Sequence, residues 1–382
     1  MAFGIVCEYN PFHNGHLHQI NEIRHTSDEP IICVMSGNFT QRGEIAIADK
    51  YARAKMALLC GADLILELPV PFCMASAEYF ASTSIDILAR MGVDKLSFGS
   101  ECADAEKIMR IAKIVASDNF KSECANVSRE QGSANAYFDL LAEKSGVENI
   151  KSNDILGIEY TKAIIKNGYN MQIYPIKREG NAYRDTELEA GELPSASAIR
   201  EAIFNGDFND IASFVPTPTL QILRENEFSD IEYIKNGVLL ALRLINVNKL
   251  DVAISDKGLV NRIFAIAQES VSFDEFEEKI QTKKYTASAI RRAILYILLG
   301  IKQSDLDTAP QYTVLLGANE KGREYLSKIR RKEDAIRIIA KPADAEGTRQ
   351  FELSKKADAL YTMCFENKKD SGYYIKKSPV II

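Results

Sequence analysis

The sequence contains 382 residues, of which 47 are basic and 53 acidic, so the formal net charge is -6. At about 100–200 residues per domain, this length predicts two or three domains. Hydrophobic residues make up 46% of the chain and charged residues 26%, which is typical of a globular protein and argues against collagen, coiled coil and disorder. No run approaches the ~18 apolar residues of a membrane span, and the N-terminus lacks a secretory signal pattern, so we expect no membrane association.

The seven cysteines are odd in number, lie mostly in apolar runs and form no CxxC pair. This pattern argues against a disulfide scaffold. We therefore expect a reducing, cytoplasmic location.

The charge is divided unevenly along the chain. Residues 281–382 hold 20 basic and 12 acidic side chains, whereas residues 1–280 hold 27 basic and 41 acidic ones. A polyanionic partner would therefore meet the C-terminal part.

Short apolar runs alternate with helical patterns over the first two hundred residues. Strands buried on both faces should be continuously apolar, as residues 31–35 are. The expected strands are Ala2–Cys7, Pro30–Met35, Ala62–Leu68, Lys95–Gly99 and Met171–Ile176, and the expected helices are Gly15–Arg24, Asp49–Cys60, Ala75–Ala89 and Ala105–Ala116. This alternation predicts an α/β fold with a Rossmann-like, doubly wound parallel sheet, whose ligand lies beyond the carboxyl ends of the strands.

Beyond residue 194 the pattern becomes mainly helical. A helix is expected over residues 195–204, followed by Ile231–Asn246, Lys257–Glu269, Phe273–Gln281 and Ala287–Leu299. A last unit has strand-like residues at 313–317 and 336–340, with helices near Glu320–Arg331 and Gln350–Phe365. We expect a Rossmann-like catalytic domain over residues 1–214 and a mostly helical C-terminal domain over residues 215–382. The sequence ASAIR occurs at 196–200 and again at 287–291 without similar flanks, and we interpret the recurrence as coincidence.

All four histidines lie in the first 25 residues, and two of them belong to the segment HNGH at 13–16, where the first expected helix follows the first strand. The N–H groups and the dipole of a helix N-terminus favour phosphate at such a position. His13 and His16 are three residues apart and can reach the same anion, while Gly15 lets the backbone approach it. A single histidine here would more often cap a helix or face solvent, but the pair in this setting predicts a nucleotide site.

Three histidines within six residues also suggest zinc. His16 and His18 differ by two positions and point apart on one helix, so His13, His16 and His18 cannot all face one metal. No cysteine pair or suitably spaced carboxylate completes a ligand set, and we expect no protein metal site.

The HNGH segment resembles the HxGH signature of the HIGH superfamily, which includes nucleotidylyltransferases and class I aminoacyl-tRNA synthetases. Residues 194–200 resemble the second signature of these proteins, ISSTxIR, with Ser195, Ser197 and Arg200 at matching positions and Pro194 and Ala196 departing from it. The resemblance implies that this second helix start holds the β- and γ-phosphates of ATP, a role that serine caps and an arginine would suit. An ordinary capped helix would also explain the second motif alone.

Six segments make the resemblance more specific. In order, residues 8–16, 35–44, 62–69, 98–101, 153–160 and 176–180 are similar to the bacterial tRNA(Met) cytidine acetate ligase family, and the similarity covers nearly the whole chain. Enzymes of this family make acetyl-adenylate from acetate and ATP and pass the acetyl group to the wobble cytidine of elongator tRNA(Met). The resemblance implies that His13, His16, Ser197 and Arg200 are catalytic. The implied ATP-binding residues are Cys7, Glu8, Tyr9, Asn10, Pro11, Phe12, His13, Asn14, Gly15, His16, Leu17, His18, Gln19, Ile20, Gly99, Asn153 and Arg178.

Individual residues carry further expectations. Gly99 would let a base or ribose lie against the backbone, and Arg178 offers a planar donor fork to phosphate or carboxylate. The family pattern has Pro-Asn-Asn where residues 152–154 read Ser-Asn-Asp, so the departure affects Asp154 rather than Asn153. ATP is the expected substrate, together with Mg²⁺.

Five polar side chains offer weaker signals. Asn38, Gln41 and Arg42 follow the second expected strand and would line the pocket, with a solvated loop as the alternative. Glu8 and Glu101 could hold Mg²⁺ through water, but neither belongs to a ligand cluster.

Three groups of basic residues lie in the part of the chain expected to meet tRNA. They are Lys283, Lys284, Arg291 and Arg292; Lys328, Arg330, Arg331, Lys332 and Arg337; and Lys368, Lys369, Lys376 and Lys377. Two other functions stay open: a small-molecule adenylyltransferase, which would not need the long basic extension, and a non-catalytic nucleotide- or RNA-binding protein. No obligate protein partner is expected.

Overall fold

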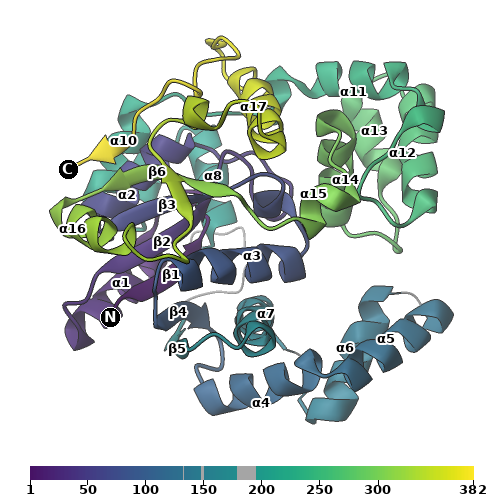
Figure 1. The fold of residues 1–382 in the computed structure, drawn as a ribbon. Helices are drawn as coiled ribbons and strands as arrows, with labels where there is room; N and C mark the ends of the chain where they lie inside the picture. Colours follow the sequence, from purple (N-terminus) through teal and green to yellow (C-terminus); the bar gives the residue numbers. More distant parts are fainter. Residues whose placement is uncertain (132, 148–149, 179–194) are drawn as a thin grey trace.

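The computed structural model describes residues 1–131, 133–147, 150–178 and 195–382, and these form one eight-stranded sheet flanked by helices (Figure 1). The strand order is β5-β4-β1-β2-β3-β6-β7, and β8 pairs with β6. The strands are β1 (Phe3–Cys7), β2 (Ile31–Ser36), β3 (Leu64–Leu68), β4 (Lys95–Ser100), β5 (Gln172–Lys177), β6 (Tyr312–Ala318), β7 (Arg337–Ile339) and β8 (Val380–Ile381).

The five strands of the first half are parallel, and their order reverses at β1. The chain passes from β1 to β2 and β3 on one side, then to β4 and β5 on the other. In sheets of this kind, the ligand binds at the carboxyl ends of the strands beside the reversal. The predicted α/β fold with a doubly wound sheet is confirmed.

Helices of the first half cover the sheet. Right-handed crossovers place α1 and α2 on one face and α3 and α7 on the other, where the last two contact each other (Figure 1). The bounds are α1 (Asn14–Thr26), α2 (Lys50–Leu59), η1 (Phe72–Met74), α3 (Ala77–Arg90), α4 (Ala105–Ala116), α5 (Asp118–Gln131), α6 (Ser133–Ser145) and α7 (Ser152–Asn167).

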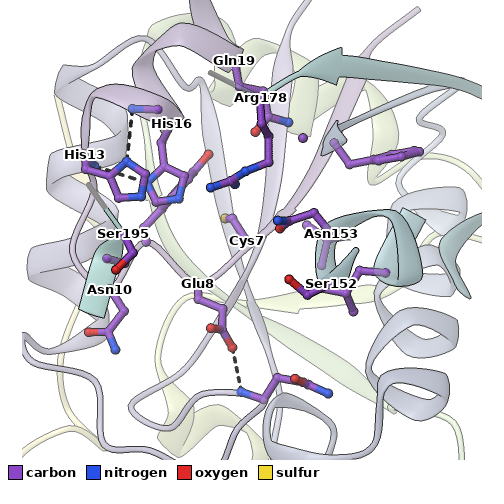
Figure 2. Close-up of a pocket in the computed structure, with 18 of the residues that line it drawn as sticks. Cys7, Glu8, Asn10, His13, His16, Gln19, Ser152, Asn153, Arg178 and Ser195 are labelled. Carbon is purple, nitrogen blue, oxygen red and sulfur yellow. Dashed lines mark hydrogen bonds between the residues drawn. The ribbon is translucent and has the colours of Figure 1, made fainter. Parts of the chain in front are cut away.

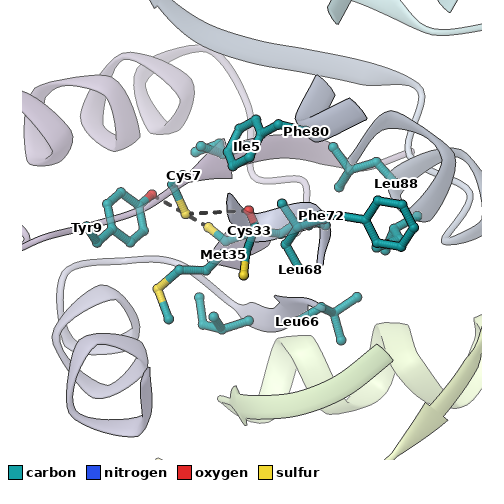
Figure 3. Packing of buried hydrophobic residues seen from close by; sticks show 14 of the residues in the cluster. Ile5, Cys7, Tyr9, Cys33, Met35, Leu66, Leu68, Phe72, Phe80 and Leu88 are labelled. Carbon is teal, nitrogen blue, oxygen red and sulfur yellow. Dashed lines mark hydrogen bonds between the residues drawn. The ribbon is translucent and has the colours of Figure 1, made fainter. Parts of the chain in front are cut away.

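The core between β1, β2, β3 and α3 is densely apolar (Figure 3). Ile5, Cys33 and Leu66 on the strands and Phe80 and Leu88 on α3 are all buried. Burial of such side chains contributes about 1.5–3 kcal/mol each relative to exposure. The packed core therefore fixes the strand ends from which the site is built.

The second half of the chain contributes helices and the remaining strands. Its helices are α8 (Ala196–Asn205), α9 (Phe208–Ile211), α10 (Thr217–Glu225), η2 (Ile231–Tyr233), α11 (Lys235–Leu244), η3 (Val247–Lys249), α12 (Lys257–Glu269), α13 (Phe273–Ile280), α14 (Ala287–Leu299), α15 (Gln303–Asp307), α16 (Glu320–Ile329), η4 (Pro342–Ala345) and α17 (Arg349–Thr362). Helices α11 to α14, which we call the helical unit, lie beside the sheet and share a second core that includes Leu242, Ile263, Phe276 and Ile294 (Figure 1).

The last part of the chain returns to the first sheet. β6 pairs antiparallel with β3, and β7 and β8 pair with β6. All seven residues of β6 are buried, because its apolar sequence is covered on both faces. The expected division at residue 214 stays a prediction, since the sheet contains strands from both sides of it. None of the described helices is long and apolar enough to cross a membrane.

Candidate active site

A pocket opens where the sheet order reverses, at the carboxyl ends of β1, β4 and β5 (Figure 2). The starts of α1, α7 and α8 and the tip of the loop after β2 complete its wall. The predicted residues that line it are Cys7, Glu8, Tyr9, Asn10, His13, Gly15, His16, His18, Gln19, Gly99, Asn153, Arg178 and Arg200, together with the weaker candidates Gln41 and Arg42. The structure thus brings together segments that are far apart in the sequence.

Other predicted residues lie behind this wall. Phe12 and Ile20 belong to the apolar core, and the Asn14 side chain donates to the carbonyl of Ser213 at 2.9 Å. Ser197 contacts Arg200, whose Nη2 donates to its Oγ at 3.2 Å. The predicted residues that do not line the pocket are Pro11, Phe12, Asn14, Leu17, Ile20 and Ser197, together with the weaker candidates Asn38 and Glu101.

His13 and His16 form a stacked pair at the start of α1. Their ring centroids lie 3.7 Å apart with an interplanar angle of 27°. The N–H of Gly15 donates to Nδ1 of His13 at 3.1 Å, and the N–H of His13 donates to Nδ1 of His16 at 3.2 Å. Because each Nδ1 is an acceptor, each neutral ring carries its proton on Nε2. The helix start therefore provides two imidazole N–H donors in addition to its backbone.

Gly15 is required by this pair. A Cβ at position 15 would come within 2.9 Å of Cε1 of His13. Contacts that short do not occur between well-packed carbon atoms, so a side chain would displace the ring. The glycine that the sequence suggested for backbone approach thus also makes room for His13.

Burial lowers the pKa of His13 to about 3, and the positive charges of Arg178 and Arg200 act in the same direction. Burial also holds the pKa of His16 well below its usual range, with His13 and Arg178 contributing. Both rings are therefore neutral at physiological pH. A neutral pair can donate from Nε2 while keeping both Nδ1 acceptor bonds, which a protonated ring could not.

The lowered pKa of His13 predicts a loss of stability in acid. Below about pH 6.5 the unfolded chain protonates His13 while the folded protein does not, so the free energy of unfolding falls as the pH drops toward 3. Urea unfolding should show a steeper fall between about pH 6.5 and 4 for the native protein than for His13→Asn. The matched control is His25→Asn, because His25 is exposed at the other end of α1, and it should keep the native slope. Equal slopes for all three proteins would contradict the assignment.

Arg178 follows β5 and extends toward His16 (Figure 2). Its side chain fills the space that a Cβ of Gly99 would need, since that atom would lie 3.2 Å from Cγ of Arg178. The absence of a side chain at Gly99 therefore leaves room for the Arg178 side chain, which the sequence did not show. Gly99 also lines the pocket, as predicted.

Arg200 reaches the pocket from α8. Its Nη1 donates to the carbonyl of Asn10 at 2.9 Å, and its Nη2 lies 3.2 Å from Oε2 of Glu44. Ser195 caps the helix, because its Oγ accepts from the N–H of Ala198. The second predicted motif thus forms a capped helix start whose arginine contacts the loop of the first motif.

A reciprocal clamp fixes the start of α7. The Glu101 carboxylate accepts from Nδ2 of Asn153 at 2.6 Å and from the N–H of Asp154 at 3.0 Å. The Asp154 carboxylate in turn accepts from the Ser100 hydroxyl and from the N–H groups of Glu101 and Cys102. Asp154 accepts these bonds as an asparagine oxygen would, which explains why the chain tolerates the departure from Pro-Asn-Asn. Glu101 is occupied in positioning Asn153.

Within the described parts of the chain, Glu8 is one of two carboxylates that line the pocket, and Glu44 is the other. Oε1 of Glu8 accepts from the N–H of Gln41 at 2.6 Å, and burial raises the pKa of Glu8. Among the residues that the structure describes, no three His, Cys, Asp or Glu side chains gather in a metal-binding group.

Known proteins match the chain over its whole length. The family HIGH Nucleotidyl Transferase matches residues 1–374. A tRNA(Met) cytidine acetate ligase from Acetivibrio thermocellus is 38% identical over 96% of this chain and 95% of that protein, and one from Limosilactobacillus reuteri is 35% identical over 100% and 99%. The chain belongs to the tRNA(Met) cytidine acetate ligase family.

Solved structures agree with this family assignment. Thermotoga maritima TmcAL in its apo form is 31% identical with a TM-score of 0.90, and the form bound with alpha-thio ATP is 30% identical with a TM-score of 0.87. Each covers all of this chain and is covered fully by it. The resemblance that the sequence indicated is confirmed.

Four apolar or aromatic residues and one carboxylate of the pocket were not predicted from the sequence. Phe80, Phe98, Leu156 and Tyr160 line it, as does Glu44. Leu156 and Tyr160 follow Asn153 at helical spacing of three and seven, so recognition of α7 would have identified them. Phe80 and Phe98 carry no such signal, because they resemble ordinary core residues.

Two of the three predicted basic groups have members at opposite edges of the sheet. α16 packs beside the amino ends of the parallel strands, since a Cβ on Gly322 would clash with the carbonyl of Asp63, and Lys332 lies next to Gly92. Arg291 and Arg292 of α14 instead contact the carbonyls of Arg42 and Gln41 at the pocket edge. Two of the three basic groups that we expect to meet tRNA therefore lie at different edges of the sheet, and their role in tRNA binding stays a prediction.

Proposed function

We propose that the protein is a tRNA(Met) cytidine acetate ligase. It would form acetyl-adenylate from acetate and ATP, release pyrophosphate, and transfer the acetyl group to the exocyclic amine of the wobble cytidine in elongator tRNA(Met). The observation that carries the proposal is the pair of Nε2–H donors of His13 and His16, placed with Arg178 and Arg200 around one pocket. Four positive or hydrogen-donating groups in one crevice suit a triphosphate.

In the first half-reaction, an oxygen of acetate attacks the α-phosphorus of ATP and the bond to pyrophosphate breaks. His13 and His16 would donate to oxygens of the phosphoryl group as negative charge grows there. Arg200, positioned by Ser197, would stabilise the departing pyrophosphate. Such transfers depend on placement and electrostatics, and no protein nucleophile is required.

Mg²⁺ would enter with the nucleotide. It prefers phosphate and water oxygens with one or two carboxylates, and Glu8 is the predicted carboxylate that lines the pocket. Glu101 is already engaged with Asn153 and Asp154. We therefore propose that Glu8 would hold Mg²⁺ through a water molecule. The ion would neutralise negative charge on the phosphates.

In the second half-reaction, the cytidine amine attacks the acetyl carbonyl carbon. The bond from that carbon to the phosphate oxygen breaks, AMP leaves with its electrons, and the amine gives up a proton to solvent. The base must be unstacked from the anticodon loop to reach the pocket. The pocket residues lie at the carboxyl ends of the strands, so the base would approach from that edge of the sheet. We infer that the protein acts in the cytoplasm, in keeping with its cysteine pattern.

The two basic edges predict different effects on tRNA binding. Lys283 and Lys284 precede α14, whose Arg291 and Arg292 contact the loop at the pocket edge. Reversal of both lysines to glutamate should weaken binding of the anticodon arm about tenfold to a hundredfold at low salt. The double variant Arg330→Glu/Arg331→Glu at the opposite edge carries the same charge change and should weaken binding less. Filter binding of tRNA and of an isolated anticodon stem-loop would measure both effects. If the Arg330→Glu/Arg331→Glu variant lost more affinity than the lysine variant, the anticodon arm would bind at the edge beside α16, which would contradict this prediction.

Pyrophosphate release tests the proposed function against its alternatives. The ligase should release pyrophosphate from ATP when acetate is present and tRNA is absent. When tRNA is added, it should acetylate the tRNA. A small-molecule adenylyltransferase, which shares both motifs, would need a phosphorylated acceptor such as a nucleotide or pantetheine instead of acetate. A non-catalytic binding protein would bind ATP without releasing pyrophosphate. Either of the last two outcomes would overturn the proposal.

A further inference from the structure

The loop after β2 joins the nucleotide pocket to the helical unit through one carboxylate. Oε2 of Glu44 lies 3.2 Å from Nη2 of Arg200, and Oε1 of Glu44 lies 3.0 Å from Nη2 of Arg291. The two arginines end the two ASAIR sequences, at 196–200 and 287–291. We interpreted the recurrence of ASAIR as coincidence, but the final arginines of both copies contact the same residue, Glu44.

The two helix starts are built alike. Ser195 caps α8 by accepting from the N–H of Ala198, and Thr286 caps α14 by accepting from the N–H of Ala289. Each arginine follows its cap by five residues, so each side chain leaves its helix in the same turn. Because the helices approach the loop from different directions, their guanidinium groups meet on Glu44.

The loop is held firmly between these helices. The N–H of Thr40 donates to the carbonyl of Glu44, and Gly43 adopts a φ of +72° at the tip. A Cβ on Gly43 would lie 2.8 Å from the backbone nitrogen of Arg292, so only glycine allows this approach. The backbone of the loop at Gly43 therefore packs directly against α14.

We propose that Glu44 is a positioning residue, and that Arg291 limits how strongly Glu44 holds Arg200. One carboxylate oxygen goes to each arginine, so Arg200 has a single-point contact and can turn its remaining donors to a phosphate. Without Arg291, both oxygens of Glu44 are released to pair with Arg200 in the stronger two-point geometry. A phosphate would then compete with that pair. Through Arg291, the helical unit contributes to ATP binding although Arg291 does not line the pocket.

The test is a double-mutant cycle on ATP affinity. Arg291→Ala should raise the dissociation constant for ATP about fivefold to twentyfold in the native background. In the Glu44→Gln background, the same change should have no effect, because no carboxylate remains to capture Arg200. Arg291→Lys retains a cation that can reach Glu44 and should restore most of the affinity.

The matched control is Arg262→Ala, which removes another arginine of the helical unit. Arg262 donates to the carbonyls of Ile280 and Gln281 and has no contact with the loop. This variant should leave ATP affinity unchanged even if it lowers the melting temperature. Equal effects of Arg291→Ala in both backgrounds, or no effect in the native one, would overturn the inference.

Equilibrium binding of ATP keeps this inference separate from the proposed function, on which it rests only for the identity of the anion. If the native protein bound ATP but did not activate acetate, the proposed function would fail while the cycle could still be read. If acetate were activated but the effects of Arg291→Ala and Glu44→Gln on the dissociation constant for ATP were simply additive, only the proposed role of Glu44 would be contradicted. Should Arg291→Ala not fold, Arg291→Met, which keeps the length of the side chain but removes its charge, measures the same coupling.

Discussion

His16→Ala is expected to slow acetyl-adenylate formation about a hundredfold to a thousandfold. The change removes the Nε2–H donor and also leaves the N–H of His13 without the Nδ1 acceptor that it has at 3.2 Å. His13, which stacks on His16, would lose its neighbour as well. The rate should be measured in a single turnover from labelled acetate and ATP, because this isolates the chemical step from product release.

Two other substitutions at position 16 separate the donor from the volume of the ring. Glutamine places an amide N–H close to the position of Nε2, whereas the shorter asparagine places it near that of Nδ1. His16→Gln should therefore recover more of the rate than His16→Asn. A native rate in His16→Ala, or a better rate with asparagine than with glutamine, would mean that His16 does not donate to the phosphoryl group.

Arg53→Met is expected to lower the free energy of unfolding by about 3–5 kcal/mol. Arg53 is fully buried, and its guanidinium donates to the carbonyls of Ala48, Glu8, Ser36 and Gly37. Methionine fills similar space but has no donor, so these buried acceptors would lose their partner. Urea unfolding followed by circular dichroism measures the loss.

The control for Arg53 is Arg243→Met in the helical unit. Arg243 also donates to backbone carbonyls, those of Ala267 and Ser270, but the residue is exposed. Water can replace its hydrogen bonds, so the loss should be about 1 kcal/mol. Equal losses in the two variants would show that the burial of Arg53 is not what makes it important.

The regular elements of the fold could be predicted closely from the sequence. α4, α12 and α14 begin and end at the predicted residues, because apolar spacing and capping residues mark their ends. The position of β6 was also predicted, but its partner was not. Pairing with β3 joins residues about 250 apart, and no local pattern encodes such a contact.

The site could be predicted where a motif joins residues that are close in sequence. His13, Gly15 and His16 lie in one turn of chain, so their spacing alone places them together. Glu44 could not be found in this way, since its role depends on two arginines from different helices. Residues 179, 180 and 194, which belong to the segments that carry the family resemblance, lie outside the described residues.

The most direct test of the account is the product formed on tRNA. The protein, ATP and isotopically labelled acetate should be incubated with elongator tRNA(Met), and the digested nucleosides analysed by mass spectrometry. We predict labelled N4-acetylcytidine at the wobble position, in amounts that fall sharply with His16→Ala. ATP-dependent pyrophosphate release without any acetylated cytidine in the tRNA would contradict the account.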